Sequence, residues 1–152
     1  MKRWGWMALL LVPMFFVGCG GDGIEFVSGT VTLDGEVPAA CANNSAVITF
    51  HPVDGGTGAI AYGGSTPDGK YTLTTDGGEA EAGARAGDYI VTVELRDAPK
   101  PVISDDPSKT PVMVVKQAPL VTPEKYTKKE TSDLKVTVKP GNNDIPLALT
   151  SK

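Results

Sequence analysis

Histidine, cysteine and the common catalytic motifs are scarce in this sequence. Its 152 residues include one histidine, His51, and two cysteines, Cys19 and Cys41. Zinc sites usually need two or more nitrogen or sulfur ligands besides carboxylates, and neither Gly-x-Ser-x-Gly nor Gly-x-x-x-x-Gly-Lys-Ser/Thr occurs. The sequence therefore predicts a protein that is not an enzyme and that holds no metal or cofactor. The alternative is a hydrolase that uses His51.

Basic residues are missing from the first half of the chain. From Cys19 to Gly69 there is no lysine or arginine but there are six acids, and the whole chain has a formal net charge of −4. This balance disfavours a nucleic acid as partner. The acidic half is predicted to be a solvated surface, and attraction of cations or basic partners is the alternative.

Acidic residues near glycines or in pairs offer the oxygen ligands that calcium prefers. None has the spacing of an EF-hand loop, and Asp-Gly is also what tight turns need. No metal site is therefore expected at these residues, which are Asp54, Asp68, Asp76, Glu79, Asp105 and Asp106.

The sequence also lacks a long apolar run, because the apolar run near its amino terminus is short. Lys2 and Arg3 precede an uncharged, mostly apolar run from Trp4 to Val17, followed by small residues around Cys19. This is the layout of a secretory signal. A helix from Trp4 to Gly18 would span roughly 22 Å, less than the roughly 30 Å of a bilayer's hydrocarbon core. Residues 1–18 are therefore predicted to be a cleaved signal peptide.

The end of this signal, Phe16-Val17-Gly18-Cys19, resembles the lipobox of bacterial lipoproteins. The resemblance implies cleavage before Cys19, a diacylglyceryl group on its thiol and a further acyl chain on the new amino terminus. Two or more chains anchor a protein stably, because each buried methylene contributes about 0.8 kcal/mol. Cys19 is the predicted lipidation site, and the protein is expected to be exported and lipid-anchored at the cell envelope, at the outer membrane or the periplasmic or extracellular face. An ordinary signal peptide and an uncleaved anchor are the alternatives.

The remaining residues predict a short tether and one all-β domain. Residues 19–25 are rich in glycine and indicate a flexible tether, and residues 26–152 indicate a single domain. Several segments alternate between apolar and polar residues, as half-buried strands do, and turn signals such as Asp34-Gly35 and Asp68-Gly69 separate them. The predicted strands are 26–33, 46–51, 58–65, 71–75, 88–95 and 134–139, with 145–149 closing a hairpin that starts at Leu134.

Two segments of unusual composition lie between these strands. Residues 76–87 are rich in glycine and are predicted to be a loop. Residues 97–124 contain six prolines and predict a long loop, with one edge strand at 112–115. Cys41 would have no disulfide partner if Cys19 is lipidated, and a buried apolar role is expected for it.

The order of these pieces resembles a carboxypeptidase regulatory-like domain. The pieces are Ser28–Gly35, Ala46–Phe50, Asp68–Tyr71 and Ala86–Val93. The resemblance implies a seven-stranded, transthyretin-like β-sandwich. Tyr71 and Tyr89 are predicted to be core residues, because a tyrosine can bury its ring and keep its hydroxyl at the rim.

Together these expectations describe a non-catalytic, lipid-anchored module of the cell envelope. Its expected partners are the membrane, through the lipid on Cys19, and a protein or polysaccharide of the envelope. The loop at about 97–124 is the candidate contact at the membrane-distal end. A passive structural role without a specific ligand is the alternative.

Overall fold

The computed structural model describes residues 23–43, 46–53, 59–75, 81–98, 101–102, 114–115 and 118–152. In these residues the fold is all-β, as predicted, and its helical parts are two short 3₁₀ turns, η1 (Ala39–Asn43) and η2 (Glu124–Thr127). The predicted signal peptide and Cys19 lie outside the described residues. Within the described ranges, no helix is long and apolar enough to cross a membrane.

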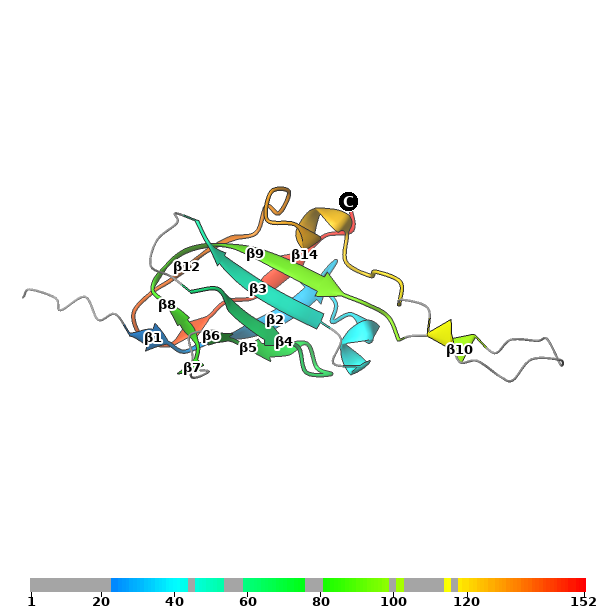
Figure 1. The fold of residues 1–152 in the computed structure, drawn as a ribbon, viewed down its shortest axis with the longest axis horizontal. Helices are drawn as coiled ribbons and strands as arrows, with labels where there is room; N and C mark the ends of the chain where they lie inside the picture. Colours follow the sequence, from blue (N-terminus) through cyan, green and yellow to red (C-terminus); the bar gives the residue numbers. More distant parts are fainter. Residues whose placement is uncertain are drawn as a thin grey trace, which may run out of the picture.

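The larger of two main sheets has six strands, and every neighbouring pair in it is antiparallel. Its order is β12 (Lys135–Val138), β9 (Gly87–Leu95), β3 (Ala46–Pro52), β4 (Ala61–Gly64), β6 (Thr74–Thr75) and β7 (Glu81–Ala82) (Figure 1).

The smaller sheet is built around β2 (Val27–Leu33). On one side β2 pairs antiparallel with β5 (Lys70–Thr72). On its other side it pairs parallel with β13 (Asn143–Asp144) and then with β14 (Leu147–Leu149). Two short ladders complete the structure: β1 (Ile24–Glu25) with β8 (Ala84–Arg85), and β10 (Pro101–Val102) with β11 (Val114–Val115).

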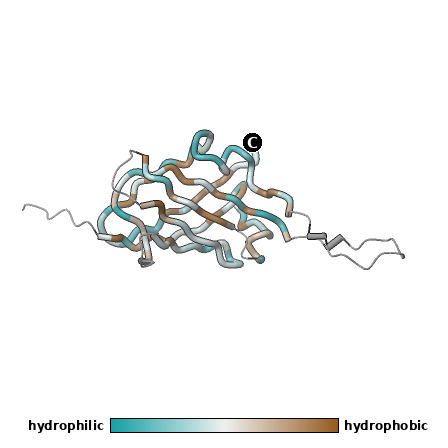
Figure 2. Tube along the Cα trace, viewed as in Figure 1, coloured by the Kyte–Doolittle hydropathy of each residue, from teal (hydrophilic) through white to brown (hydrophobic). Residues whose placement is uncertain are grey.

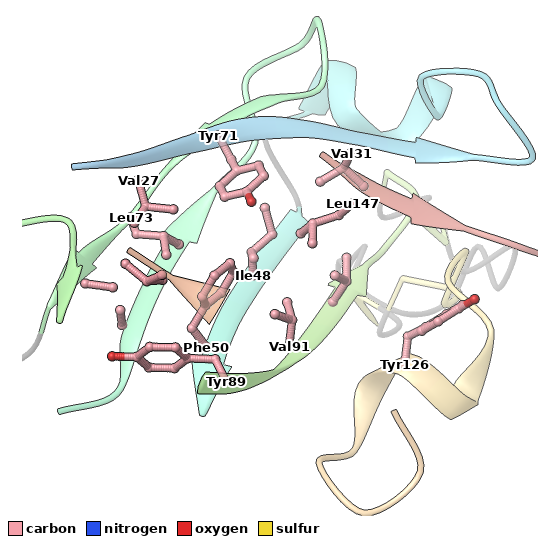
Figure 3. Close-up of a cluster of buried hydrophobic side chains, with 14 of the residues drawn as sticks. Val27, Val31, Ile48, Phe50, Tyr71, Leu73, Tyr89, Val91, Tyr126 and Leu147 are labelled. Atoms are coloured by element: carbon pink, nitrogen blue, oxygen red, sulfur yellow. The ribbon is translucent and has the colours of Figure 1, made fainter. Parts of the chain in front are cut away.

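The two main sheets pack face to face over one apolar core. Alternate residues of each strand point inward, because side chains of a strand alternate between its two faces. Figure 3 shows Val27 and Val31 facing Ile48, Phe50 and Val91 of the opposite sheet. In Figure 2, the hydrophobic residues accordingly lie mostly along the strands of the sandwich.

An aromatic cluster connects the sheets. Tyr71 and Tyr89 are 2% and 1% exposed, which confirms that both are core residues. The Phe50 ring lies between them, with its centroid 6.4 Å from that of Tyr71 and 5.8 Å from that of Tyr89. Both pairs are tilted, the kind of geometry that aromatic rings prefer over a face-to-face stack.

The C-terminal segment is not the hairpin that was predicted from Leu134 to Leu149. β12 joins the larger sheet, whereas β13 and β14 join the smaller one, so the chain crosses between the sheets at Gly141, whose φ is +100°. The side chain of Asn143 closes this crossing, because it accepts a hydrogen bond from the Lys139 amide (2.9 Å) and donates one to the Lys139 carbonyl (2.8 Å). Because of this crossing, β12 and β14 both bury apolar residues in the same core.

The strand on the other side of β2 also passes between the sheets. β5 pairs with β2, but β6, one residue further, pairs with β4, so the chain changes sheet at Leu73. The Leu73 amide donates to the Val27 carbonyl at 3.1 Å, and the Leu73 carbonyl accepts from the Gly83 amide at 2.7 Å. The predicted hairpin of residues 58–65 with 71–75 is present as the pairing of β4 with β6.

Two predicted boundaries change. Residues 76–87 were expected to form a loop, but the part that the structure describes, residues 81–87, contains β7 and β8. The tether was expected to reach residue 25, but Ile24 and Glu25 pair with Arg85 and Ala84. The domain therefore already includes Ile24, and backbone hydrogen bonding rather than the hydrophobic pattern sets this boundary.

The Tyr71 hydroxyl gives the core a measurable dependence on pH. It donates to the Ile145 carbonyl at 2.6 Å, and burial raises the pKa of Tyr71 well above its ordinary value. The phenol therefore stays protonated in the folded protein while the unfolded chain ionises near pH 10. Its contribution to stability is complete below about pH 10 and is lost as the pH rises further.

We expect Tyr71→Phe to lower the free energy of unfolding by about 1–2 kcal/mol at neutral pH, because the Ile145 carbonyl loses its donor. The variant should also lose less stability than the wild type between neutral and alkaline pH. Urea unfolding followed by circular dichroism checks both. Tyr62→Phe is the control, because Tyr62 is 43% exposed on the outer face. Equal alkaline losses in Tyr71→Phe and wild type would contradict the assignment.

Candidate functional site

Residues 96–121, here called the arm, continue from β9 at one end of the sandwich, in the segment where a long loop with one edge strand was predicted. The structure describes residues 96–98, 101–102, 114–115 and 118–121 of the arm. Its root is an antiparallel continuation of β9, with Arg96 bridged to Leu120. The ladder of β10 and β11, with Val102 opposite Val114, has the same register as this bridge. Of the predicted edge strand at 112–115, the described residues Val114 and Val115 pair with Val102 and Pro101.

The prolines of this segment suggested a loop, but Pro119 occupies a place where no N–H is needed. Its carbonyl accepts a hydrogen bond from the Asp97 amide at 3.0 Å. A proline can take such a position in a ladder, because only its nitrogen is unable to bond.

A second, small core holds the root of the arm against the sandwich. Leu95 is fully buried with Ala40, Cys41 and Ala46, and Val121 packs against them. The Leu95 amide also donates to Thr122 Oγ1 at 2.7 Å. Cys41 is buried and free, as predicted.

A cleft of about 510 Å³ lies between the root of the arm and the connection from β2 to η1. The tight turn at Asp34 and Gly35, whose φ angles are +53° and +88°, forms part of its rim, and Leu33 is bridged to Glu36 across this turn. The residues that line the cleft are Leu33, Asp34, Glu36, Val37, Pro38, Ala39, Ala40, Asp97 and Val121.

Three carboxylates of the cleft carry its charge. Asp34 Oδ1 accepts the Ser151 amide at 3.0 Å, and hydrogen bonding by Ser151 lowers the pKa of Asp34. Asp97 Oδ1 accepts the Ala98 amide at 2.8 Å. In the described part of the chain, no lysine or arginine forms an ion pair with Asp34, Glu36 or Asp97. No described lysine or arginine therefore neutralises these three carboxylates through an ion pair.

The charges do not converge on one point. Among the described residues, no group of three or more His, Cys, Asp or Glu side chains is placed to hold a metal ion. Of the acids considered above for calcium, Asp68 is the one in the described ranges. It lies in a turn, where it pairs with Lys70 at 3.0 Å and bonds the Thr66 hydroxyl. The other candidates lie outside the described residues.

His51 does not line the cleft. It lies at the end of β3, where its Nε2 is 3.0 Å from Thr92 Oγ1. Partial burial lowers the pKa of His51, and the nearby positive charge of Lys129 lowers it further. The structure thus places His51 near a strand end, as expected, and apart from the arm and its cleft.

Sequence reasoning missed the cleft and the buried ring of Tyr126. The lysine-rich residues 125–129 around it favour a solvated surface, but Tyr126 is 2% exposed and its hydroxyl lies 3.2 Å from Thr150 Oγ1. The sequence signals for the cleft were the Asp34-Gly35 turn and the lack of lysine and arginine from Cys19 to Gly69.

The chain was compared with family models, with curated proteins and with solved structures, and none of them matched. The geometry of the arm and the cleft is therefore what bears on function.

Proposed function

We propose that the protein is a non-catalytic, lipid-anchored module of the cell envelope that binds a protein or polysaccharide at the end opposite its anchor. One observation carries this proposal. β1 and the β10 ladder lie at opposite ends of the long axis of the molecule (Figure 1). Cys19 precedes Ile24 by five residues, which span at most roughly 18 Å. Lipid on Cys19 would therefore hold the β1 end near the membrane and leave the arm and cleft facing away from it.

We further propose that the sandwich is of the transthyretin-like, carboxypeptidase regulatory-like kind. Support comes from the strand count, because β5 with β6 and β13 with β14 are each one interrupted strand. The sandwich then has seven principal strands beside the short β1, β7 and β8 and the two strands of the arm. An experimental structure with a different strand order would contradict this assignment.

One experiment tests the anchor and the binding end together, by comparing three forms of the full chain expressed in cells, with a fourth form, Cys41→Ala, as a control. The first is the wild type and the second is Cys19→Ser. In the third, residues 99–117 are replaced by Asn-Gly. That replacement joins Ala98 to Ala118, which face each other in the register set by the Arg96–Leu120 bridge, through a favoured two-residue turn.

We expect the wild type to fractionate with membranes and to carry acyl chains at its mature amino terminus. Cys19→Ser should leave the membrane fraction, whereas Cys41→Ala, the control at the buried cysteine, should stay in it. The form with the replaced arm should stay at the membrane but lose envelope partners that the wild type retains after cross-linking. A mature wild-type protein that starts at Cys19 without acyl chains would overturn the anchor. Unchanged partners after arm replacement would overturn the binding role of the arm.

A further inference from the structure

We propose that the cleft at the root of the arm binds a basic peptide segment of a protein partner, taking up a lysine or arginine side chain. This inference rests on the proposed function as a binding module, and it names the chemical class of the partner. The cleft combines two chemistries that such a side chain needs. Its apolar lining suits the aliphatic stem, and its carboxylates suit the charged head.

The apolar part of the cleft comes from two segments that are far apart in the sequence. Leu33 ends β2, Val37 and Pro38 follow its turn, and Val121 belongs to the returning strand of the arm. Val37 is 41% exposed, so its side chain is accessible to a ligand. The volume of about 510 Å³ is within the range typical of ligand sites.

The charges stand on both walls of the cleft. Asp34 and Glu36 belong to the turn after β2, and Asp97 belongs to the outgoing strand of the arm. Asp34 and Asp97 each use one carboxylate oxygen to accept a backbone amide, and this bond holds each side chain in position. A cationic ligand would find oriented carboxylates that no described lysine or arginine neutralises.

Two other ligand classes fit the cleft less well. The described acidic side chains are not gathered as metal ligands are. None of the residues that line the cleft is aromatic, so a sugar would have no ring to stack on. Alternating lysine and apolar residues in an extended peptide would match both the separated charges and the apolar walls.

Calorimetric titration of the purified full chain tests this inference with four capped pentapeptides. The first alternates lysine with leucine. The second has diaminopropionate in place of lysine, which keeps the charge but shortens the stem. The third has glutamine in place of lysine, and the fourth has glutamate. A neutral glucan oligosaccharide serves as a fifth probe.

The variants remove charge from the cleft with little change of shape. The cleft variant combines Asp34→Asn, Glu36→Gln and Asp97→Asn. Asparagine can still accept the Ser151 and Ala98 amides, and it tolerates the positive φ of Asp34. The control variant combines Glu124→Gln, Glu130→Gln and Asp133→Asn, which changes the net charge equally on exposed residues outside the cleft.

We expect the lysine peptide to bind the wild type and the control variant alike, and to bind the cleft variant on the order of tenfold more weakly. The diaminopropionate and glutamine peptides should bind more weakly than the lysine peptide, and added salt should weaken lysine binding. Equal affinity of cleft and control variants, or binding of the glucan and not of the lysine peptide, would overturn the inference.

The form with the replaced arm separates this inference from the proposed function. It keeps Asp97 and Val121, so it should still bind the lysine peptide as the wild type does. If the arm replacement abolishes partner capture while no peptide binds the cleft, the proposed function stands and the basic-peptide inference fails. If the peptide binds the cleft but no partner depends on the arm, the binding role of the arm fails.

Discussion

Phe50→Ala is expected to destabilise the protein by about 3–5 kcal/mol, the usual cost of removing a large buried ring. Phe50 is fully buried in the middle of the larger sheet, and its ring contacts Tyr71 from the smaller sheet and Tyr89 from its own. The substitution would leave a cavity where the aromatic cluster connects the two layers. The loss is a large fraction of the roughly 5–15 kcal/mol by which a typical domain is stable.

Urea unfolding followed by circular dichroism measures this loss. Phe50→Leu, which fills part of the space, should cost about 1 kcal/mol and keep the experiment measurable if the alanine variant unfolds. Val47→Ala is the control on the same strand, because Val47 points outward and is 55% exposed. It should change stability by no more than about 0.5 kcal/mol. A similar small change for Phe50→Ala would contradict the role assigned to the cluster.

Gly29→Ala should be the second most damaging change, at about 2–3 kcal/mol. A Cβ atom at Gly29 would lie 2.0 Å from the Ile145 carbonyl oxygen and 2.8 Å from Tyr71 Cε1. Ile145 is one of the two residues between β13 and β14, and its carbonyl accepts the hydrogen bond from the Tyr71 hydroxyl. The backbone of Ile145 and the Tyr71 ring would both have to move.

Gly64→Ala provides the matched control, at a strand glycine of the larger sheet. Among the described residues other than its chain neighbours, the atom closest to its added Cβ would be the Ala46 carbonyl oxygen at 3.5 Å, which is an ordinary contact. We expect its stability to stay within about 1 kcal/mol of the wild type. Thermal unfolding of the two variants compares them directly, and equal midpoints would show that the approach of Ile145 to Gly29 is not tight.

Alternation of apolar and polar residues was sufficient to predict β2, β3 and β9 and the inward positions of Tyr71 and Tyr89. These strands are long, and one side of each is fully covered, so the hydrophobic pattern determines which residues face the core. The pattern does not determine which strand pairs with which. Residues from Leu134 to Leu149 alternate equally well in a hairpin and in a crossing between sheets, so the crossing could not be predicted.

The sequence did not predict the described pairing in the arm or the cleft, for two different reasons. Proline disfavours a ladder because it lacks an N–H, yet Pro119 takes part in pairing through its carbonyl, so proline content did not indicate the described pairing at Arg96–Asp97. The cleft joins residues near 34 to Asp97 and Val121. Whether these residues come together depends on the order of strands in the sheets and on where the chain returns to β9. Neither can be predicted from the local sequence.

The parallel pairing of β2 with β14 has a mechanical consequence. These are the first long strand and the last strand of the domain, and they run in the same direction. Traction on the two ends of the chain would pull them past one another lengthwise. The hydrogen bonds between them would then share the load and break together, whereas those of a hairpin pulled at its open end break one after another. Tension applied to the two ends of the chain would therefore be resisted by this pair of strands.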